Sequence, residues 1–287
     1  MKTEQTFLGV LIALLLLAAI FFVIERIFGR GRKQSFFRSG WLTDAVYLFA
    51  TALLTKPLTR LVILVPVSIL LLTKATSADI LKLGAYRGFG PISWQPLWLQ
   101  GIEIYLLADL IAYWSHRLFH TGNWWPFHAV HHSSEDLDWL GSLRVHPVNE
   151  LVTKLTQTTP LLLLGFNPIV TLTATPFLTF YAVFLHANVN WDFGPLRSVI
   201  ATPVFHRWHH SKDREAWDKN FAGLFPFWDI LFGTYYMPKG RYPENFGICE
   251  PMPKGYLGQL WEPFAWLRRR ARKVDPAGAV QIAGSEG

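Results

Sequence analysis

The 287-residue sequence has few charged residues and almost no cysteine. It contains a single cysteine, Cys249, which excludes a disulfide framework and a zinc site built from several cysteines. Charged residues make up 16% of the sequence and hydrophobic residues 51%, whereas an average soluble domain has about 25% charged residues. This shortage of charge indicates a membrane protein.

The net charge is +7, and the basic residues that produce it flank apolar segments. Basic residues in such positions are typical of cytoplasmic loops and of contacts with anionic lipid heads. We therefore expect no nucleic-acid partner.

Two apolar segments in the first hundred residues predict membrane helices. Residues 7–24 contain no charge over a length of 18, which is long enough to cross a bilayer. Five basic residues follow this segment: Arg26, Arg30, Arg32, Lys33 and Arg38. This pattern favours a membrane anchor, with the N-terminus outside and the next loop in the cytoplasm, over a cleaved signal peptide. Residues 41–72 predict either one kinked span or a re-entrant hairpin, because Pro57 interrupts them.

Further apolar segments complete the predicted fold. Residues 74–95 are mixed in character and indicate an interfacial segment, and residues 97–114 predict another span. Residues 155–191 are uncharged and broken by Gly-Phe-Asn-Pro at 165–168, which predicts two short helices joined by a turn. Together these segments predict an all-α membrane protein, with a transmembrane stem of about four or five spans and a cytoplasmic helical cap.

The histidines are confined to one part of the sequence and are regularly spaced. All ten lie between positions 116 and 210. Residues three or four apart share one face of a helix, close enough to bind one metal. Four segments show this spacing: HRLFH at 116–120, HAVHH at 128–132, HANVN at 186–190 and HRWHH at 206–210.

So many imidazoles predict two metal ions rather than one. Zinc usually takes four ligands and octahedral metals take six, and imidazole binds metal in its neutral form. A haem protein would place paired histidines inside membrane spans, whereas these lie at span ends and in polar segments. The sequence also lacks the HExxH motif of zinc proteases.

The histidine segments, with LRVHPVNE at 143–150 and NFAGLFPFWDILFGTYY at 220–236, resemble the fatty acid hydroxylase/sterol desaturase superfamily. The resemblance runs from about residue 105 to 234 and implies a catalytic region over 101–240. Residues 1–100 would then form transmembrane helices with the interfacial segment, and residues 241–287 a cytoplasmic tail.

This resemblance implies two iron ions, with O2 as co-substrate, at a site that faces the cytoplasm. It implies that nine histidines bind the metals: His116, His120, His128, His131, His132, His186, His206, His209 and His210. Asn190 stands where some members have a further histidine, so it would bind weakly or through water. No side-chain nucleophile is required, because the metals carry the chemistry.

Four other residues are candidates for supporting roles. Asp109 lies two helical turns before His116 and would hydrogen-bond a ligand histidine, or else face the helix bundle for packing. Asp229 would orient a histidine or cap a turn. Arg144 would pair with an acidic residue at 135, 136 or 150, and His146 is a family feature with no assigned ligand role.

The predicted function is O2-dependent hydroxylation or desaturation of a membrane lipid such as a sterol, fatty acyl chain or ether lipid. Electrons would come from an external donor, either a ferredoxin or a cytochrome b5-like protein with its reductase. Two alternatives stay open: a zinc-dependent lipid hydrolase, and a metal-binding membrane protein without catalysis.

Overall fold

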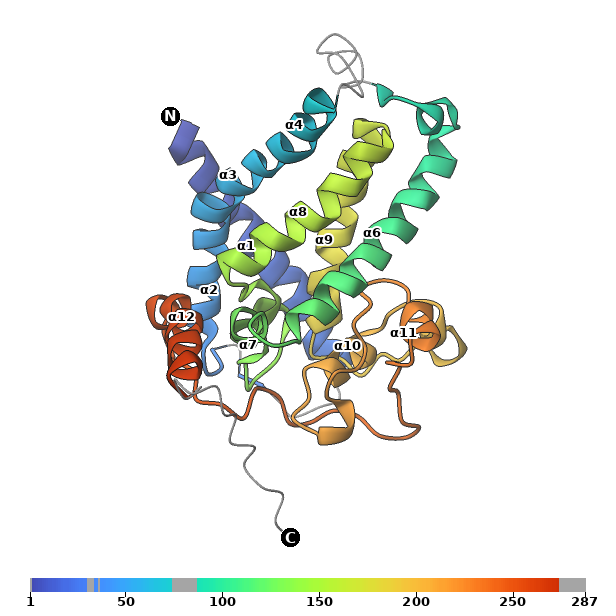
Figure 1. The fold of residues 1–287 in the computed structure, drawn as a ribbon. Coiled ribbons are helices and arrows are strands. Elements are labelled where there is room, and N and C mark those ends of the chain that lie inside the picture. The colour runs from blue at the N-terminus through green and yellow to red at the C-terminus, as the bar shows by residue number, and fades with distance from the viewer. Residues whose placement is uncertain (1, 30–33, 36, 74–86, 274–287) are drawn as a thin grey trace.

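The computed structural model describes residues 2–29, 34–35, 37–73 and 87–273 (Figure 1). Helices make up most of this part of the chain, and its only β-type pairing is an isolated bridge between Ser211 and Phe246. The helical class predicted from the sequence is therefore confirmed. Part of the predicted interfacial segment, at 74–86, and the end of the predicted tail, at 274–287, lie outside the described residues.

The N-terminal part consists of α1 (Lys2–Phe28) and one long interrupted helix. That helix runs through α2 (Trp41–Ala50), the π-helical η1 (Thr51–Thr55), α3 (Lys56–Thr59), the 3-10 segment η2 (Arg60–Ile63) and α4 (Leu64–Leu72). Of the two alternatives for residues 41–72, the structure therefore has a continuous helix and not a hairpin. Pro57 lacks the N–H for an α-helical hydrogen bond, and the wider π turn directly before it accommodates that loss.

Three helices in the described residues are long and apolar enough to cross a membrane: Phe7–Phe28, Trp41–Leu72 and Pro168–His186. Many of their large apolar side chains are exposed, among them Leu15, Leu58 and Leu172, as expected for surfaces that contact lipid. The prediction of four or five spans goes beyond this finding and stays a prediction.

Two further long helices pack beside these segments. α6 (Leu97–Phe119) follows the short 3-10 segment η3 (Pro91–Trp94) and contacts α8 (Pro147–Leu164) and α9 (Pro168–His186). α8 and α9 form the predicted hairpin. Gly165 at its turn has φ +82°, a left-handed conformation that glycine adopts without a Cβ clash, and the Asn167 side chain caps α9.

The remaining helices are short, and most gather at one end of the long ones (Figure 1). They are α7 (Trp125–His132), η4 (Trp139–Leu143), η5 (Gly194–Ser198), α10 (Pro203–His209), η6 (Arg214–Ala216), α11 (Phe227–Leu231) and the longer α12 (Tyr256–Lys273). A buried cluster including Tyr113, Leu185, Phe205 and Phe221 joins α6, α9 and α10 to the loop after η6. This packing brings all the histidine segments to one end of the molecule.

Candidate metal centre

Nine of the ten histidines converge in two groups, within each of which the candidate ligand atoms lie within 4.8 Å of one another. We call the first group the five-histidine group; it contains His116, His120, His128, His132 and His209. We call the second the four-histidine group; it contains His131, His186, His206 and His210. These are the nine histidines that the sequence analysis selects, and they come from α6, α7, α9 and α10 or directly follow them.

The two HxxHH segments are each divided between the groups. On α7, His128 and His132 belong to the five-histidine group and His131 to the other. On α10 the assignment is reversed, because His206 and His210 share one group while His209 joins the other. The pair spaced by four residues stays together, and the third histidine points elsewhere. Each short helix therefore supplies both groups, which lie against each other: the rings of His132 and His210 stack with centroids 4.3 Å apart.

Hydrogen bonds fix the proton on one nitrogen of several rings. The Nδ1 atoms of His116, His131 and His186 lie 2.8, 3.1 and 2.7 Å from the carbonyl oxygens of Phe221, Arg144 and Ala182 respectively. His128 Nδ1 lies 2.8 Å from Asn149 Oδ1. Since these partners only accept, each Nδ1 carries the proton and each Nε2 presents a lone pair.

Those Nε2 lone pairs face one another. The Nε2 atoms of His116 and His128 are 3.0 Å apart, and those of His131 and His186 are 3.1 Å apart. Neither atom of either pair has a proton to donate, so the contacts are repulsive unless a cation lies between them. Two imidazole nitrogens bound to one metal at right angles, each at about 2.1 Å, are about 3.0 Å apart. One pair belongs to each group, and the residues present therefore fit one metal ion in each.

Buried atoms without partners support the same fit. His120 Nε2 and His209 Nε2 are buried and have no hydrogen-bond partner within the described chain. A buried imidazole nitrogen is seldom left unsatisfied in a folded protein. Both atoms belong to the five-histidine group.

Burial keeps the imidazoles neutral. It lowers the pKa of His128, His131 and His132 well below the usual value, and neighbouring imidazoles lower it further because their positive charges would repel. The same two causes lower the pKa of three histidines near α10: His206, His209 and His210. Neutral imidazole is the form that binds metal.

His146 lies outside both histidine groups, and Asn190 lies outside the helix that carries His186. His146 begins α8, where its Nδ1 accepts from the Val148 N–H and its Nε2 lies 3.1 Å from the Leu260 carbonyl oxygen. Asn190 was expected on the helical face of His186, but α9 ends at His186 and an extended segment follows. The helical pairing of these two residues is therefore wrong.

Asp109 and Asp229 hold the loop at 221–225 instead of touching a histidine. Asp109 accepts hydrogen bonds from the backbone N–H groups of residues 223, 224 and 225, at 2.7 to 3.0 Å. Asp229 accepts from the N–H groups of residues 221 and 222 and from the hydroxyl of Thr234. The hydrogen bond expected between Asp109 and a histidine is absent from the described contacts. Both carboxylates support the histidines indirectly. They hold the loop at 221–225, and the Phe221 carbonyl of that loop accepts from His116.

Arg144 belongs to a buried charge network and does not pair with the acidic residues that the sequence analysis considered. Its Nε donates to Asp44 at 2.5 Å, and Arg38 binds both Asp44 and Asp138. The network joins the start of α2 to η4. It also fixes the position of the Arg144 carbonyl, which accepts from His131.

Sequence reasoning missed several supporting residues. Asn149 and Asp218 contact His128 and His120 through their side chains, and Lys219 contacts His209 through its carbonyl at 2.7 Å. Asn149 is buried in the first turn of α8, a helix in which Glu150, Thr153 and Lys154 are polar too, so the sequence does not single it out. The contacts of Asp218 and Lys219 depend on loop geometry, for which the sequence carries no pattern.

A cavity of about 250 Å³ reaches the five-histidine group. Three histidines of that group line it: His120, His132 and His209. Trp125, Trp217, Cys249 and Glu250 form other parts of its wall. We call it the histidine cavity.

Comparison with known proteins agrees with this arrangement. Residues 102–234 match the family model described as fatty acid hydroxylase. The chain is 34% identical over 192 residues to an ornithine lipid hydroxylase of Rhizobium tropici, covering 67% of this chain and 57% of that protein. It is 36% identical over 151 residues to alkylglycerol monooxygenase of Homo sapiens, covering 52% of this chain and 33% of that protein.

No solved structure matches the chain, which spans about half or less of the length of most of the curated relatives it matches. The family match nevertheless covers the region that contains all nine converging histidines. The resemblance seen in the sequence is thereby confirmed, and residues 102–234 carry a fatty acid hydroxylase domain.

Proposed function

We propose that the protein is an integral-membrane hydroxylase that uses two iron ions and O2 to oxidise a C–H bond of a lipid. The observation that carries the proposal is the pair of Nε2 lone-pair contacts, one in each histidine group, which require a cation between them. The relatives support the reaction class, since one is named a lipid hydroxylase and another a monooxygenase.

In this proposal the five-histidine group holds one iron and the four-histidine group holds the other. The two irons supply the chemistry of O2 activation. For hydroxylation the balance is one C–H bond, one O2, two electrons and two protons, which give one C–OH group and one water. An external donor, a ferredoxin or a cytochrome b5-like protein with its reductase, supplies the electrons.

The protein's own residues keep the ligands ready for metal. The carbonyls of Phe221, Arg144 and Ala182 fix the proton on Nδ1 of three histidines, which leaves each Nε2 free to bind. Burial keeps competing water away from the four-histidine group, all of whose members are buried. The histidine cavity gives a small molecule access to the other group.

We also propose that this end of the molecule faces the cytoplasm. Arg26 lies in the last turn of α1, at the end of that helix nearest the histidines, since the neighbouring Glu25 accepts from the N–H of Asn188, two residues after His186. A cytoplasmic position matches the excess of basic residues in the sequence that follows α1. Desaturation instead of hydroxylation would need a second hydrogen abstraction at the same site.

Metal analysis of the full chain, purified in detergent from iron-supplied cells, tests the proposal. We expect about two irons per chain, and a His131→Ala variant should lose at least the iron of its group. His146→Asn is the matched control, because asparagine keeps the helix cap and this histidine lies outside both groups. Iron loss in the control equal to that in His131→Ala would contradict the ligand assignment.

Isotope labelling tests the reaction. Under ¹⁸O2, a lipid extract from cells that express the chain should contain a product with one labelled oxygen, and the His131→Ala variant should not form it. Protein that holds zinc and no iron, and releases a product without O2, would replace the proposal with the zinc hydrolase.

A further inference from the structure

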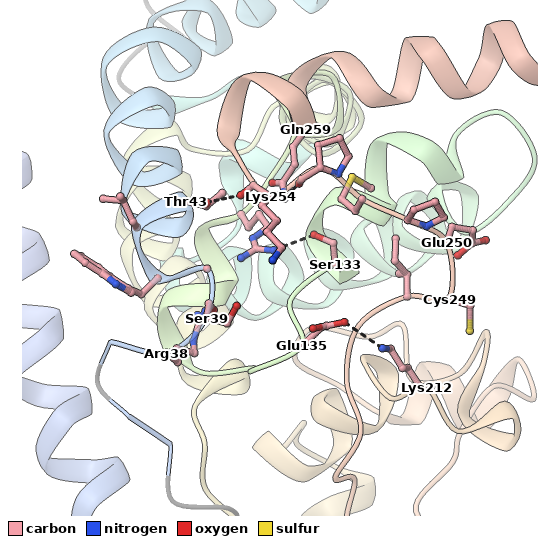
Figure 2. A pocket seen from close by; sticks show the side chains of 18 of the residues that line it. Arg38, Ser39, Thr43, Ser133, Glu135, Lys212, Cys249, Glu250, Lys254 and Gln259 are labelled. Atoms are coloured by element: carbon pink, nitrogen blue, oxygen red, sulfur yellow. Dashed lines mark hydrogen bonds and ion pairs between the residues drawn. The ribbon is translucent and has the colours of Figure 1, made fainter.

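A second and larger cavity, of about 910 Å³, lies between the start of α2, the segment at 248–254 and α12 (Figure 2). Arg38, Arg144 and Gln259 line it and are buried. Lys212, Glu135, Glu250 and Lys254 also line it and are more exposed. We call it the polar cavity.

Gln259 shows that this cavity is built to hold a polar group. Its side chain is 2% exposed, and its Nε2 donates to the Pro253 carbonyl at 2.8 Å. Its Oε1 is buried and has no hydrogen-bond partner within the described chain. A buried acceptor left unpaired is unfavourable, so a donor group from a ligand, an ammonium or a hydroxyl, would complete it.

The start of α2 favours an anionic group, whereas Gln259 Oε1 favours a hydrogen-bond donor. Gly40 has no side chain to cap the helix, and the N–H groups of Leu42 and Thr43 have no acceptor among the described contacts. Free N–H groups at a helix N-terminus favour an anion. Of the lysines that line the same cavity, Lys212 is paired with Glu135. Lys254 has no ion pair among the described contacts and adds to that preference, while the acidic Glu250 lies in the part of the wall shared with the histidine cavity.

The polar cavity adjoins the histidine cavity. Four residues line both of them: Lys212, Ile248, Cys249 and Glu250. The histidine cavity in turn contacts the five-histidine group through His120, His132 and His209. A molecule anchored in the polar cavity therefore brings its adjoining atoms towards one of the two candidate metal positions.

α12 indicates that the polar cavity lies near a lipid surface. Leu257 and Trp261, four residues apart on one face of the helix, are 77% and 58% exposed, whereas Gln259 faces the cavity. Arg268, on the same side of the helix, lies over the Trp261 ring. A helix with exposed apolar residues and basic neighbours is typical of the boundary between lipid and water.

We propose that the polar cavity binds the headgroup of the lipid substrate, and that this headgroup carries both an anionic group and an ammonium or hydroxyl donor. The anionic group lies against the start of α2, and the donor reaches Gln259 Oε1. The carbon that is oxidised then lies in the headgroup or next to it, because the adjoining cavity leads to the five-histidine group. This inference rests on the proposed function for its site of oxidation.

Lipid retention by the full chain tests the inference. Protein purified in detergent is mixed with four lipids that share the same acyl chains, and native mass spectrometry measures which lipid stays bound. The lipids are an aminoacyl lipid with a free carboxylate and ammonium, phosphatidylcholine, phosphatidylglycerol and diacylglycerol. We expect the aminoacyl lipid to be retained about tenfold more than diacylglycerol, and its free amino acid to compete weakly.

Variants locate the binding site. Gln259→Leu should lower retention of the aminoacyl lipid about tenfold, whereas Gln259→Glu keeps an acceptor and should retain it. Lys254→Ala changes an exposed residue, so it should fold even if the Gln259 variants do not, and it should weaken retention of both the aminoacyl lipid and phosphatidylglycerol. Lys239→Ala, an exposed lysine outside the cavity, is the control.

Equal retention of all four lipids, or retention unchanged in Gln259→Leu and Lys254→Ala, would overturn the inference. Competition by the free amino acid as strong as by its lipid would assign the cavity to a soluble molecule and overturn it too. Iron content is measured on the same samples. Selective retention by protein that binds no iron would contradict the proposed function alone, and iron-loaded protein without headgroup preference would contradict this inference alone.

Discussion

The two histidine groups are built from the same short helices but differ in access and in support. The five-histidine group lines a cavity through three of its members, whereas every member of the four-histidine group is buried. The five-histidine group contacts the side chains of Asn149 and Asp218 as well as the backbone carbonyls of Phe221 and Lys219. The four-histidine group relies on the backbone carbonyls of Arg144 and Ala182. The five-histidine group is therefore open to a cavity and partly held by side chains, and we call it the open group; the four-histidine group is buried, and we call it the closed group.

This difference predicts different roles for the two candidate metal positions in the proposed reaction. In the proposed function the substrate reaches the five-histidine group, because the histidine cavity ends there. The closed group has no such path among the described cavities, so its metal would serve mainly to activate O2 together with the first. Replacing one ligand in each group compares them directly.

The largest effect is expected when one ligand is removed from each group in turn. His206→Ala leaves three histidines in the closed group and should lose its metal, so that iron falls from about two to about one per chain. His120→Ala leaves four in the open group, which is still a complete set for many sites. That variant should keep about two irons but release one faster to a chelator.

Elemental analysis, followed by timed release to a chelator, measures both variants. Equal loss of iron from His120→Ala and His206→Ala would remove the distinction between the groups.

The sequence predicts the ligands better than it predicts their grouping. The spacing of four in His128 and His132 is a local property of a helix, and it correctly places these two together. The separate direction of His131 depends on the tertiary fold, which places its Nε2 atom 3.1 Å from that of His186 at the end of α9. That contact joins residues 55 positions apart, and no local pattern encodes it.

The same limit explains why Asp109 contacts a loop and not a histidine, and why Asn190 is not on the helix that carries His186. Asp109 lies two helical turns from His116 and shares its helical face. Its carboxylate nevertheless accepts its hydrogen bonds from the backbone at 223–225, which is distant in the sequence. Asn190 follows a helix end that the sequence does not mark with glycine or proline. The long helices, by contrast, follow from apolar composition and were largely predictable.

The second largest effect is expected in the charge network that supports the closed group. Asp44→Leu leaves Arg38 and Arg144 buried without a shared carboxylate, and breaking such a buried pair costs about 3–5 kcal/mol of folding free energy. Because the Arg144 carbonyl holds His131, we expect the closed group to lose iron before the open group does. Thermal unfolding in detergent, with iron release measured alongside, checks this.

The matched control is Asp192→Leu, since the Asp192–Arg197 ion pair is partly exposed and 3.7 Å long. It should change the unfolding temperature little. If Asp44→Leu left both stability and iron release unchanged, the network would have no supporting role.

A smaller effect is expected from the side-chain support of the open group. Asn149→Leu removes the acceptor of His128 Nδ1, and loss of such a partner typically lowers metal affinity about 10- to 100-fold. Thr153→Val is the control, because Thr153 contacts Asn149 but no histidine. Competition with a chelator measures the affinity of each position. Weakening confined to one iron would support the division between the groups, and equal weakening of both irons would contradict it.

The smallest effect on folding is expected at Lys212, which lines both cavities. Its ion pair with Glu135 is 3.5 Å long, and the two side chains are 33% and 73% exposed. Such pairs contribute about 0–1 kcal/mol, so Lys212→Ala and Glu135→Ala should both unfold within a few degrees of the unchanged chain. Lys212→Ala alone should also lower retention of an anionic lipid, because only the lysine can contact an anion in the polar cavity. Since the two variants break the same ion pair, equal lipid retention in both would show that Lys212 acts through Glu135 and not on the lipid.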